Sequence, residues 1–307
     1  MSDIEPRLPW SEEQWAAAQQ TVQAAARKAR VASSFLPLHG NVPPGQSVVP
    51  ALRMKAEAYP EGGTEHERLD IEDSDVLKLT TIACDVYLKT QQVEDPDLSA
   101  AMDLLTRAGD IIGRLEDAIV FNGQPAPDKP PPEVDGLPRV YTVRGGQKNG
   151  GLLKPNPDEE PPYLGVSGSG ARLGEALVVG VVGAIQQLEE NGYYGPFACV
   201  LGRALYAAAT WPSDHSLVLP SDRIIPFTDG QLLRSSTIPD NRGVVVALAA
   251  SPIDLVIGSD VHVKYLQLST EPRYVLRVSE RFVLRLKQPD AVCQLRTAQR
   301  RGRGPTP

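Results

Sequence analysis

The chain has 307 residues, of which 41% are apolar and 22% are charged, and its formal net charge is −7. This length can bury a sizeable core in one or two domains. The acidic balance excludes a general coat for DNA or RNA, because neutralising phosphates requires a basic face. The 28 prolines are about twice the usual share, which indicates long irregular connections.

The sequence contains no signal for a membrane or for export. No run reaches the roughly 20 consecutive apolar residues that cross a bilayer. The first residues, MSDIEPRLPW, place acids and prolines where a signal peptide carries a basic and then an apolar run. We therefore expect a cytoplasmic protein.

Neither the cysteines nor the histidines form a recognisable ligand set. The three cysteines lie far apart in apolar, strand-like contexts, at Cys84, Cys199 and Cys293. We expect buried, reduced thiols there. The four histidines share no metal-ligand spacing. The sequence therefore predicts no metal site and no resident cofactor.

A first helix is predicted over residues 11–31. Ser11 and Gln14 have the spacing of a capping box, in which the hydroxyl and the amide satisfy free backbone N–H groups. Acids follow the cap and basic residues precede the end, which suits the helix dipole. An apolar stripe recurs at helical spacing, formed by Trp15, Ala18, Val22, Ala25 and Ala29.

A long arm is predicted after this helix. Residues 32–46 are rich in proline and glycine, and residues 47–90 alternate as extended strands with a polar tip over 59–67. A two-stranded arm is marginal by itself because it cannot bury both of its faces. We therefore expect residues 57–73 to lie on a neighbouring copy of the chain.

The middle of the chain alternates helices with irregular segments. Residues 97–122 form the second predicted helix. Residues 123–170 are too long for an ordinary loop, so we expect a surface insertion, mobile in part. The remaining elements are a short strand at 139–143, a helix over 171–190 capped by Ser169, a strand at 197–201 and a helix at 202–210.

The last third is a run of short β-branched strands broken by turns, over residues 230–295. It contains no nucleophile, metal cluster or phosphate loop. The final residues, RTAQRRGRGPTP, are basic and poor in apolar side chains, so we expect disorder there.

Two patterns resemble catalytic motifs without completing one. Residues 165–170, GVSGSG, lack the Lys-Ser/Thr of a phosphate loop and do not match a nucleophile elbow, so they predict a flexible turn. Glu116 and Asp117 are neighbours on a helix and do not face each other, which is unsuited to acid–base pairing. The sequence therefore predicts no enzyme.

A polar loop bounded by prolines contains Asp214, His215 and Asp222. Taken alone, the pattern is typical of a solvated loop. In a closed symmetric shell the same loop could ring a pore, where repeated charge would select what passes. Both interpretations stay open.

Five segments carry a family resemblance: PWSEEQW (9–15), DVY (85–87), LEDAIVFNG (115–123), GPFACVL (195–201) and LVIGSDV (255–261). Their order and spacing resemble those of the encapsulins, bacterial or archaeal shell proteins. The resemblance implies an α+β, tailed-phage major capsid protein-like fold with a peripheral domain, an extended loop (arm) and an axial domain.

The implied division assigns each part of the chain to one of these regions. It places the N-terminal helix and start of the peripheral domain at 1–46, the extended loop at 47–76, the peripheral domain with its long helix at 77–134, the axial domain with a Pro/Gly-rich insertion at 135–235, the C-terminal strands of the peripheral domain at 236–297, and a disordered basic tail at 298–307.

The resemblance further implies a self-assembling icosahedral shell of a bacterial nanocompartment, enclosing a cargo enzyme of the ferritin-like or peroxidase type. The cargo's C-terminal targeting peptide would dock in an apolar groove beside the N-terminal helix, at Trp15, Val22, Phe35, Leu38 and Val263. The expected partners are copies of the chain and the cargo, with no membrane and no nucleic acid.

Two departures from the family pattern bear on these sites. The stretch 31–35, VASSF, lacks the basic pair that the family carries before its aromatic residue, so the groove accepts a different peptide or none. The segment 123–170 is expanded. Some members stack a flavin on a Trp at the arm's end, where this chain has Tyr87, for which core or interface packing is the stronger expectation.

The alternative from a different class is a phage or prophage major capsid protein that packages DNA. Its fold would be the same. A packaging capsid usually carries a scaffold segment before its mature start, and we expect none here.

Overall fold

The computed structural model describes residues 8–40, 42–43, 45–61, 64–130, 132–155, 163–168, 170–212, 218–269, 271 and 273–297, without the side chains of 55–68 and 171. The chain divides into two compact units. Unit 1 comprises residues 1–151 and 254–287, and unit 2 comprises residues 152–253 and 288–307.

Unit 1 is built on a five-stranded sheet in the order β1-β12-β13-β6-β7. These strands are β1 (Leu38–His39), β12 (Ile253–Leu268), β13 (Arg273–Leu286), β6 (Thr80–Lys89) and β7 (Tyr141–Gly145). β13 runs antiparallel to β6, with Arg273 opposite Lys89 and Phe282 opposite Thr80. Alternate residues of β6 are buried, as the period of a strand requires: Ile82, Cys84, Val86 and Leu88.

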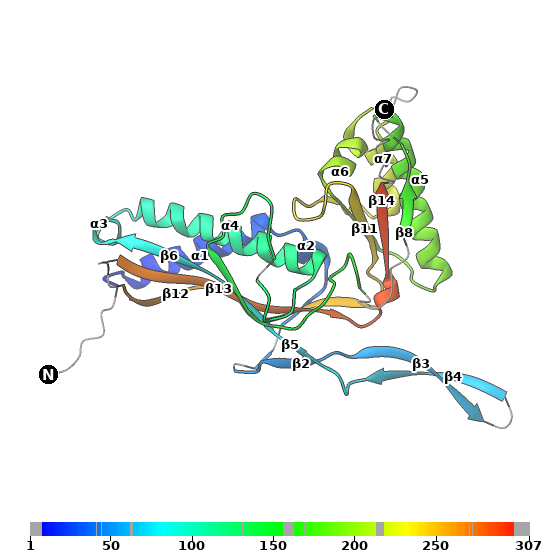
Figure 1. Cartoon of the computed structure of the whole chain (residues 1–307), viewed down its shortest axis with the longest axis horizontal. Coiled ribbons are helices and arrows are strands. Elements are labelled where there is room, and N and C mark those ends of the chain that lie inside the picture. Colours follow the sequence, from blue (N-terminus) through cyan, green and yellow to red (C-terminus); the bar gives the residue numbers. More distant parts are fainter. Residues whose placement is uncertain are drawn as a thin grey trace, which may run out of the picture. The chain divides into compact units, whose positions relative to one another are not determined.

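Two long helices cover this sheet (Figure 1). α4 (Ser99–Asn122) packs on β6 and β13, and α1 (Glu12–Ala29) packs on α4. The helices approach closely at Gly109, where an added Cβ would lie 2.6 Å from the carbonyl oxygen of Val22. Gly113 meets Ala26 in the same way. The apolar stripe of the first helix therefore packs against α4.

The helix ends follow from local chemistry. The predicted capping box is confirmed: the Ser11 hydroxyl accepts from the Gln14 N–H at 3.2 Å, and the Ser11 N–H donates to the Gln14 side chain at 2.9 Å. α4 begins at Ser99 rather than at residue 97, because Leu98 has a left-handed φ of 49°. Two short helices, α2 (Ala32–Phe35) and α3 (Thr90–Val93), lie in the connections.

The predicted arm is present as a hairpin of β3 (Arg53–Glu61) and β4 (Thr64–Glu72). Its strands pair only with each other among the described residues, and Figure 1 shows them as a ribbon of two strands. A second two-stranded sheet follows, formed by β2 (Val48–Pro50) and β5 (Val76–Lys78). Leu69 and Ile71 on β4 are exposed.

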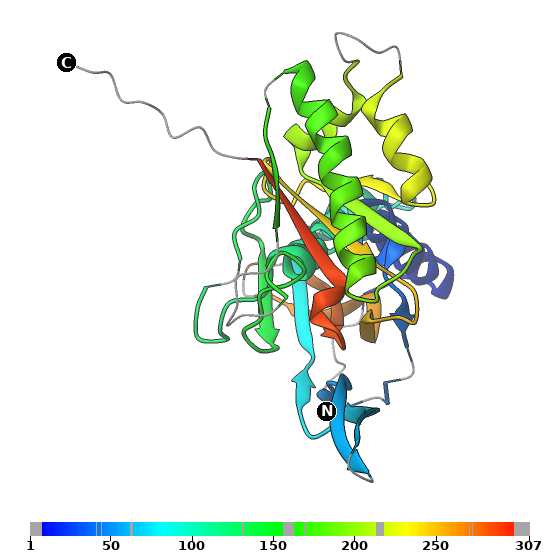
Figure 2. The ribbon, with the colours of Figure 1, turned by 90° about the vertical axis from the view of Figure 1, so that its right-hand side faces the viewer.

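Unit 2 is built on a second five-stranded sheet, in the order β10-β9-β11-β14-β8. Its strands are β10 (Leu232–Arg234), β9 (Phe197–Leu201), β11 (Arg242–Ala247), β14 (Val292–Thr297) and β8 (Tyr163–Val166). α5 (Ala171–Glu190) packs along one face of this sheet (Figure 2). Its buried side chains meet Val166, Val245 and Leu295 in one core.

Shorter helices complete unit 2. They are α6 (Arg203–Thr210), α7 (Pro220–Ile224) and the 3-10 turns η1 (Ile225–Phe227) and η2 (Pro289–Ala291). The strand predicted at 197–201 and the helices predicted at 171–190 and 202–210 are confirmed within one residue. Ser169, the predicted cap of α5, lies outside the described residues, as does the tail 298–307.

Two expectations about the organisation of the chain need correction. The segment 123–170 is not simply a surface insertion, because Gln124, Leu152 and Leu153 are buried and β7 is an edge strand of the unit 1 sheet. The stretch 236–297 is not one set of strands, because β11 and β14 join unit 2 while β12 and β13 belong to the unit 1 sheet. Long-range pairing separates these strands.

Two further observations concern the cysteines and the lengths of the apolar helices. All three cysteines are free and buried, as expected. Within the described residues, no helix combines the length and apolar character needed to span a membrane.

Candidate functional site

The N-terminal helix is held against the edge of β12 by a side-chain amide. The Gln19 amide donates to the Val261 carbonyl at 2.8 Å and accepts from the Val263 N–H at 3.0 Å. Gln23 adds a bond to the same Val261 carbonyl, at 3.3 Å. Gln19 therefore satisfies backbone groups that another strand would otherwise pair.

The five residues predicted to bind the cargo peptide differ in how deeply they are buried. Val22 is fully buried beside Gly109, and Phe35 stacks on Phe121 with ring centroids 6.4 Å apart. Both side chains belong to the chain's own core, so a docked peptide cannot contact them. The sequence correctly indicated that these side chains are apolar. It did not indicate that α4 of the same chain covers them.

Of the other three predicted residues, Trp15 and Leu38 lie nearer the surface. Trp15 is half-buried and packs edge-on against Trp10, with centroids 5.1 Å apart. Leu38 is exposed on the short edge strand β1. Val263 is buried like Val22 and Phe35, and its N–H donates to Gln19. Beyond it, Leu266 and Leu268 of β12 are partly exposed.

A buried ionic cluster fixes the end of α1. Arg30 lies between two fully buried carboxylates, with Nε 2.6 Å from Glu116 Oε2 and Nη2 2.5 Å from Glu280 Oε1. Asp260 approaches Nη1 at 3.4 Å. Burial raises the pKa of Glu116 to about 7 and that of Glu280 well above its usual range. The cluster joins α1, α4 and β13.

Asp117, which follows Glu116 in the sequence, has a different role. Its carboxylate accepts from the Val31 N–H at 2.9 Å and from the Ala32 N–H at 2.8 Å. It therefore caps the start of α2 from another helix. The expectation that Glu116 and Asp117 act separately agrees with this geometry, although nothing in the sequence indicated their partners.

Tyr87 lies on β6 opposite Val275, and about half of its side chain is exposed. Asp85, two residues earlier, forms a two-pronged ion pair with Arg277, at 2.7 and 2.8 Å. Tyr87 is therefore outside the chain's own core, and both an interface role and flavin stacking stay predictions.

The predicted pore residues are only partly described. Asp214 and His215 lie outside the described residues. Asp222 is exposed in the first turn of α7. Its neighbour Arg223 pairs with Glu175 of α5 at 2.6 Å. These contacts hold α7 against α5, and they do not test the pore.

Unit 2 also carries an open apolar depression of about 560 Å³, lined by Val178, Val179, Val182, Gly183, Gln186, Arg223 and Phe227. Val179 is largely exposed there, and about half of Phe227 is exposed. Among the described residues, no cluster of three or more His, Cys, Asp or Glu side chains is placed to hold a metal ion.

The fold is that of viral capsid proteins. A virus-like particle protein from Pyrococcus furiosus matches with a TM-score of 0.67 and 15% identity, covering 93% of this chain and 100% of that one. The capsid protein of Myoviridae phage XM1 matches with a TM-score of 0.56 and 14% identity, covering 85% and 90%. These likenesses establish the fold and do not separate a compartment from a phage head.

Comparison of the sequence with known families distinguishes the compartment from the phage head. The family model described as "Encapsulating protein for peroxidase" matches residues 5–130 and 166–283, so the chain belongs to this family, the encapsulins. A "Type 1 encapsulin shell protein EncA" of Myxococcus xanthus is 27% identical over 301 residues, covering 94% of each chain. A "Diheme-cytochrome-encapsulin shell fusion protein" of Kuenenia stuttgartiensis is 24% identical, covering 95% of this chain and 75% of that one.

Proposed function

We propose that copies of this chain close into a hollow icosahedral shell in the cytoplasm and hold a cargo enzyme inside it. The chain itself would perform no catalysis, and its work would be containment. Membership of the encapsulin family supports this proposal, and the family's description favours a peroxidase-type cargo over a ferritin-like one.

The structural observation that carries the assembly step is the β3–β4 arm. Its two strands pair only with each other among the described residues, and Leu69 and Ile71 face solvent. An isolated two-stranded ribbon is marginal in water. Contact with a neighbouring copy would bury these side chains and stabilise the arm.

The assembly step is tested by making the arm polar. Leu69→Ser with Ile71→Ser should weaken assembly, with more free subunit at equal concentration in size-exclusion chromatography with light scattering. Leu104→Ser is the matched control, because Leu104 is exposed on α4, outside the arm. Equal particle yields from both variants would contradict the role of the arm.

For the cargo peptide we propose a surface that leaves out the buried residues Val22 and Phe35. It comprises Trp15 and the β12 edge around Leu266 and Leu268, whereas Leu38 lies opposite Leu255, near the start of that strand. Trp15 precedes Gln19 by four residues and so shares the helix face that meets β12. An extended peptide adds readily to such an edge, with apolar anchors giving specificity.

The cargo surface is tested with a tryptophan pair. Trp15→Ala should leave shells intact but reduce the cargo that co-purifies, measured by mass spectrometry of isolated particles. Trp211→Ala is the control, because Trp211 is an exposed tryptophan of unit 2. Full cargo loading in the Trp15 variant would exclude this surface.

A further inference from the structure

The end of α1 is held by acids that belong to other elements. Arg30 follows the last residue of α1, and its guanidinium lies 2.6 Å from the Glu116 carboxyl of α4 and 2.5 Å from the Glu280 carboxyl of β13. Asp260 of β12, which is exposed, lies 3.4 Å from the same group. Since both glutamates are fully buried, these contacts anchor the helix end in the interior of unit 1.

The two buried glutamates also contact each other. The carboxyl groups of Glu116 and Glu280 lie within hydrogen-bond reach. A carboxylate only accepts hydrogen bonds, so two of them can share one only when a proton is present. Among the described groups, none donates a hydrogen bond to Glu116 Oε1 or to Glu280 Oε2. A proton held between the carboxyl groups would satisfy an oxygen on each of them.

The charge balance of this cluster depends on that proton. The charged groups that face it are Arg30 at the end of α1, Glu116 and Asp117 of α4, Asp260 of β12 and Glu280 of β13. Among the described residues, Arg30 is the cation bonded to the two glutamates. It balances one buried carboxylate while the proton is present and faces two when the proton is lost. Unbalanced buried charge is costly, so loss of the proton favours a movement that admits water.

The balance changes near neutral pH. Burial raises the pKa of Glu116 to about 7 and the pKa of Glu280 well above its ordinary range, although Arg30 lowers both. Burial likewise raises the pKa of Asp117 to about 7. Opening the end of α1 would return these acids to water and to their ordinary pKa, so the closed arrangement holds the proton more tightly. It is therefore favoured at low pH and loses that advantage as the pH rises through about 7.

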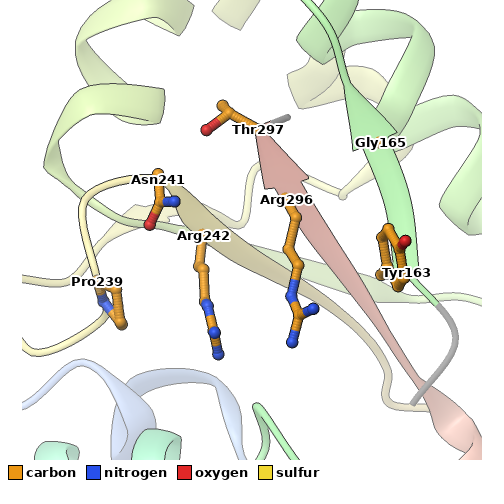
Figure 3. A pocket seen from close by; sticks show the side chains of 7 residues that line it. All are labelled: Tyr163, Gly165, Pro239, Asn241, Arg242, Arg296 and Thr297. Carbon is orange, nitrogen blue, oxygen red and sulfur yellow. The ribbon is translucent and has the colours of Figure 1, made fainter. Parts of the chain in front are cut away.

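Like charges also meet in unit 2, but there they cannot respond to pH. Arg242 of β11 lies directly opposite Arg296 of β14, and both side chains line a pocket of about 560 Å³ (Figure 3). Arginine keeps its proton throughout the pH range in which proteins fold. These two strands therefore provide an internal reference, in which like charges meet without a titrating proton.

We propose that the proton shared by Glu116 and Glu280 is a latch on the end of α1. While the proton is held, the helix end and the connection to α2 stay seated on α4 and β13. When it is lost, they open to water. The opening is confined to this end, because the preceding turns of α1 stay packed on α4 at Gly109 and bonded to β12 through Gln19. The latch needs neither a second copy nor a cargo, so it stands apart from the proposed function.

The test is hydrogen exchange of the purified full chain, read by mass spectrometry at about pH 6 and about pH 8.5, with each rate corrected for the intrinsic effect of pH. The N–H groups of Arg30, Val31 and Ala32 are hydrogen-bonded in the closed arrangement, so they report its opening. We expect their exchange to rise at least about tenfold at the higher pH, while β11 and β14 stay unchanged. Equal protection at both pH values, or an equal rise throughout unit 1, would overturn the latch.

Glutamine variants test the proton itself. In Glu116→Gln the amide donates a hydrogen bond to Glu280 at every pH, as the protonated acid does only at low pH. The rise in exchange should therefore disappear, and Glu280→Gln should have the same effect. Asp103→Asn is the matched control, because Asp103 is exposed on the same helix, and it should retain the full rise. A full rise in both glutamine variants would contradict the proposal.

A second measurement needs only the wild-type chain, so it also covers variants that fold poorly. A protonated carboxyl group has an infrared band separate from that of a carboxylate. The wild-type chain should show this band at about pH 6, where exposed acids are ionised, and should lose it as the pH rises through about 7. The band should be weaker in Glu116→Gln and unchanged in Asp103→Asn. Absence of the band in the wild type would overturn the latch.

Discussion

At the scale of single residues, the most consequential feature is the pair of buried glutamates that share Arg30. Glu116 and Glu280 both lie beside its guanidinium, and Asp260 and Asp117 add negative charge nearby. One cation cannot balance two buried carboxylates, so the folded protein favours a proton on the pair. The two groups therefore titrate together.

This pair predicts that stability falls as the pH rises. The pKa of Glu116 is about 7 in the folded chain, against 4.5 ordinarily, so the folded state holds the proton more tightly. The resulting stabilisation is complete below the ordinary carboxylate pKa and is lost as the pH rises through about 7. Urea midpoints from pH 5 to pH 8 measure this trend.

Replacing the glutamate should flatten this dependence. Glu116→Gln should remove a pH effect on the order of 2 kcal/mol between pH 5 and pH 8. Asp103→Asn is the matched control, because Asp103 is exposed on the same helix. An equally steep profile in the Glu116 variant would show that other groups cause the trend.

The capping role of Asp117 gives a second prediction. Asp117→Ala should destabilise the protein by about 2–4 kcal/mol, because the buried N–H groups of Val31 and Ala32 lose their acceptor. Asp117→Asn keeps one acceptor oxygen and should cost less. Thermal unfolding that ranks the Asn variant below the Ala variant would contradict this account.

These residues also show what the sequence could and could not predict about single side chains. Helical geometry predicts that Glu116 and Asp117 point to different neighbours, which agrees with the structure. Glu116 meets Arg30 and Glu280, and Asp117 meets the backbone of Val31 and Ala32. All of these partners are distant along the chain, and no local pattern indicates them. The same limit explains Val22 and Phe35, whose apolar character predicts burial but not whether a peptide or α4 provides it.

At the scale of elements, the contact between α1 and α4 depends on the absence of a side chain. Gly109→Ala places a methyl group 2.6 Å from the Val22 carbonyl oxygen, so one helix must shift. We expect a loss of about 1–3 kcal/mol in chemical denaturation, although alanine favours helices more than glycine does.

Gly183→Ala in α5 is the control for this substitution. There the added methyl group meets only the flexible end of Leu164, at 3.2 Å. The change should be close to neutral or slightly stabilising, because the gain in helix propensity is kept. Similar losses at both glycines would mean that helix packing does not explain the Gly109 effect.

The elements themselves were largely predictable, and their pairing was not. Helical periodicity and the Ser11 cap placed the long helices within two residues. The C-terminal strands were also recognised, but alternation alone does not select a partner. β11 pairs with β9 and β14, whereas β13 pairs with β6, nearly 200 residues earlier in the chain. Sequence resemblance indicated the fold class where local pattern could not.

At the scale of the whole molecule, two exposed apolar surfaces are the expected contacts between copies. The arm carries Leu69 and Ile71, and unit 2 carries Val179 and Phe227. Exposed apolar patches of this kind often mark interfaces. In a closed assembly each surface repeats with the symmetry, so modest contacts add up to a stable particle.

The arm gives the prediction at this scale. Replacing residues 57–70 with a short Gly/Ser turn should leave the five-stranded sheet of unit 1 folded, since the strands of the arm are not part of it. Particles should become fewer and less heat-stable, as seen by negative-stain microscopy and light scattering on heating. Particles of unchanged size and stability would count against an interlocking arm.

The most direct measurement is the sedimentation velocity of the purified full-length chain at micromolar concentration. A subunit of 33.2 kDa that builds a closed shell must sediment as a single large species containing many copies. Negative-stain images of that fraction should show hollow, rounded particles. A lone species with the mass of one chain would contradict the account.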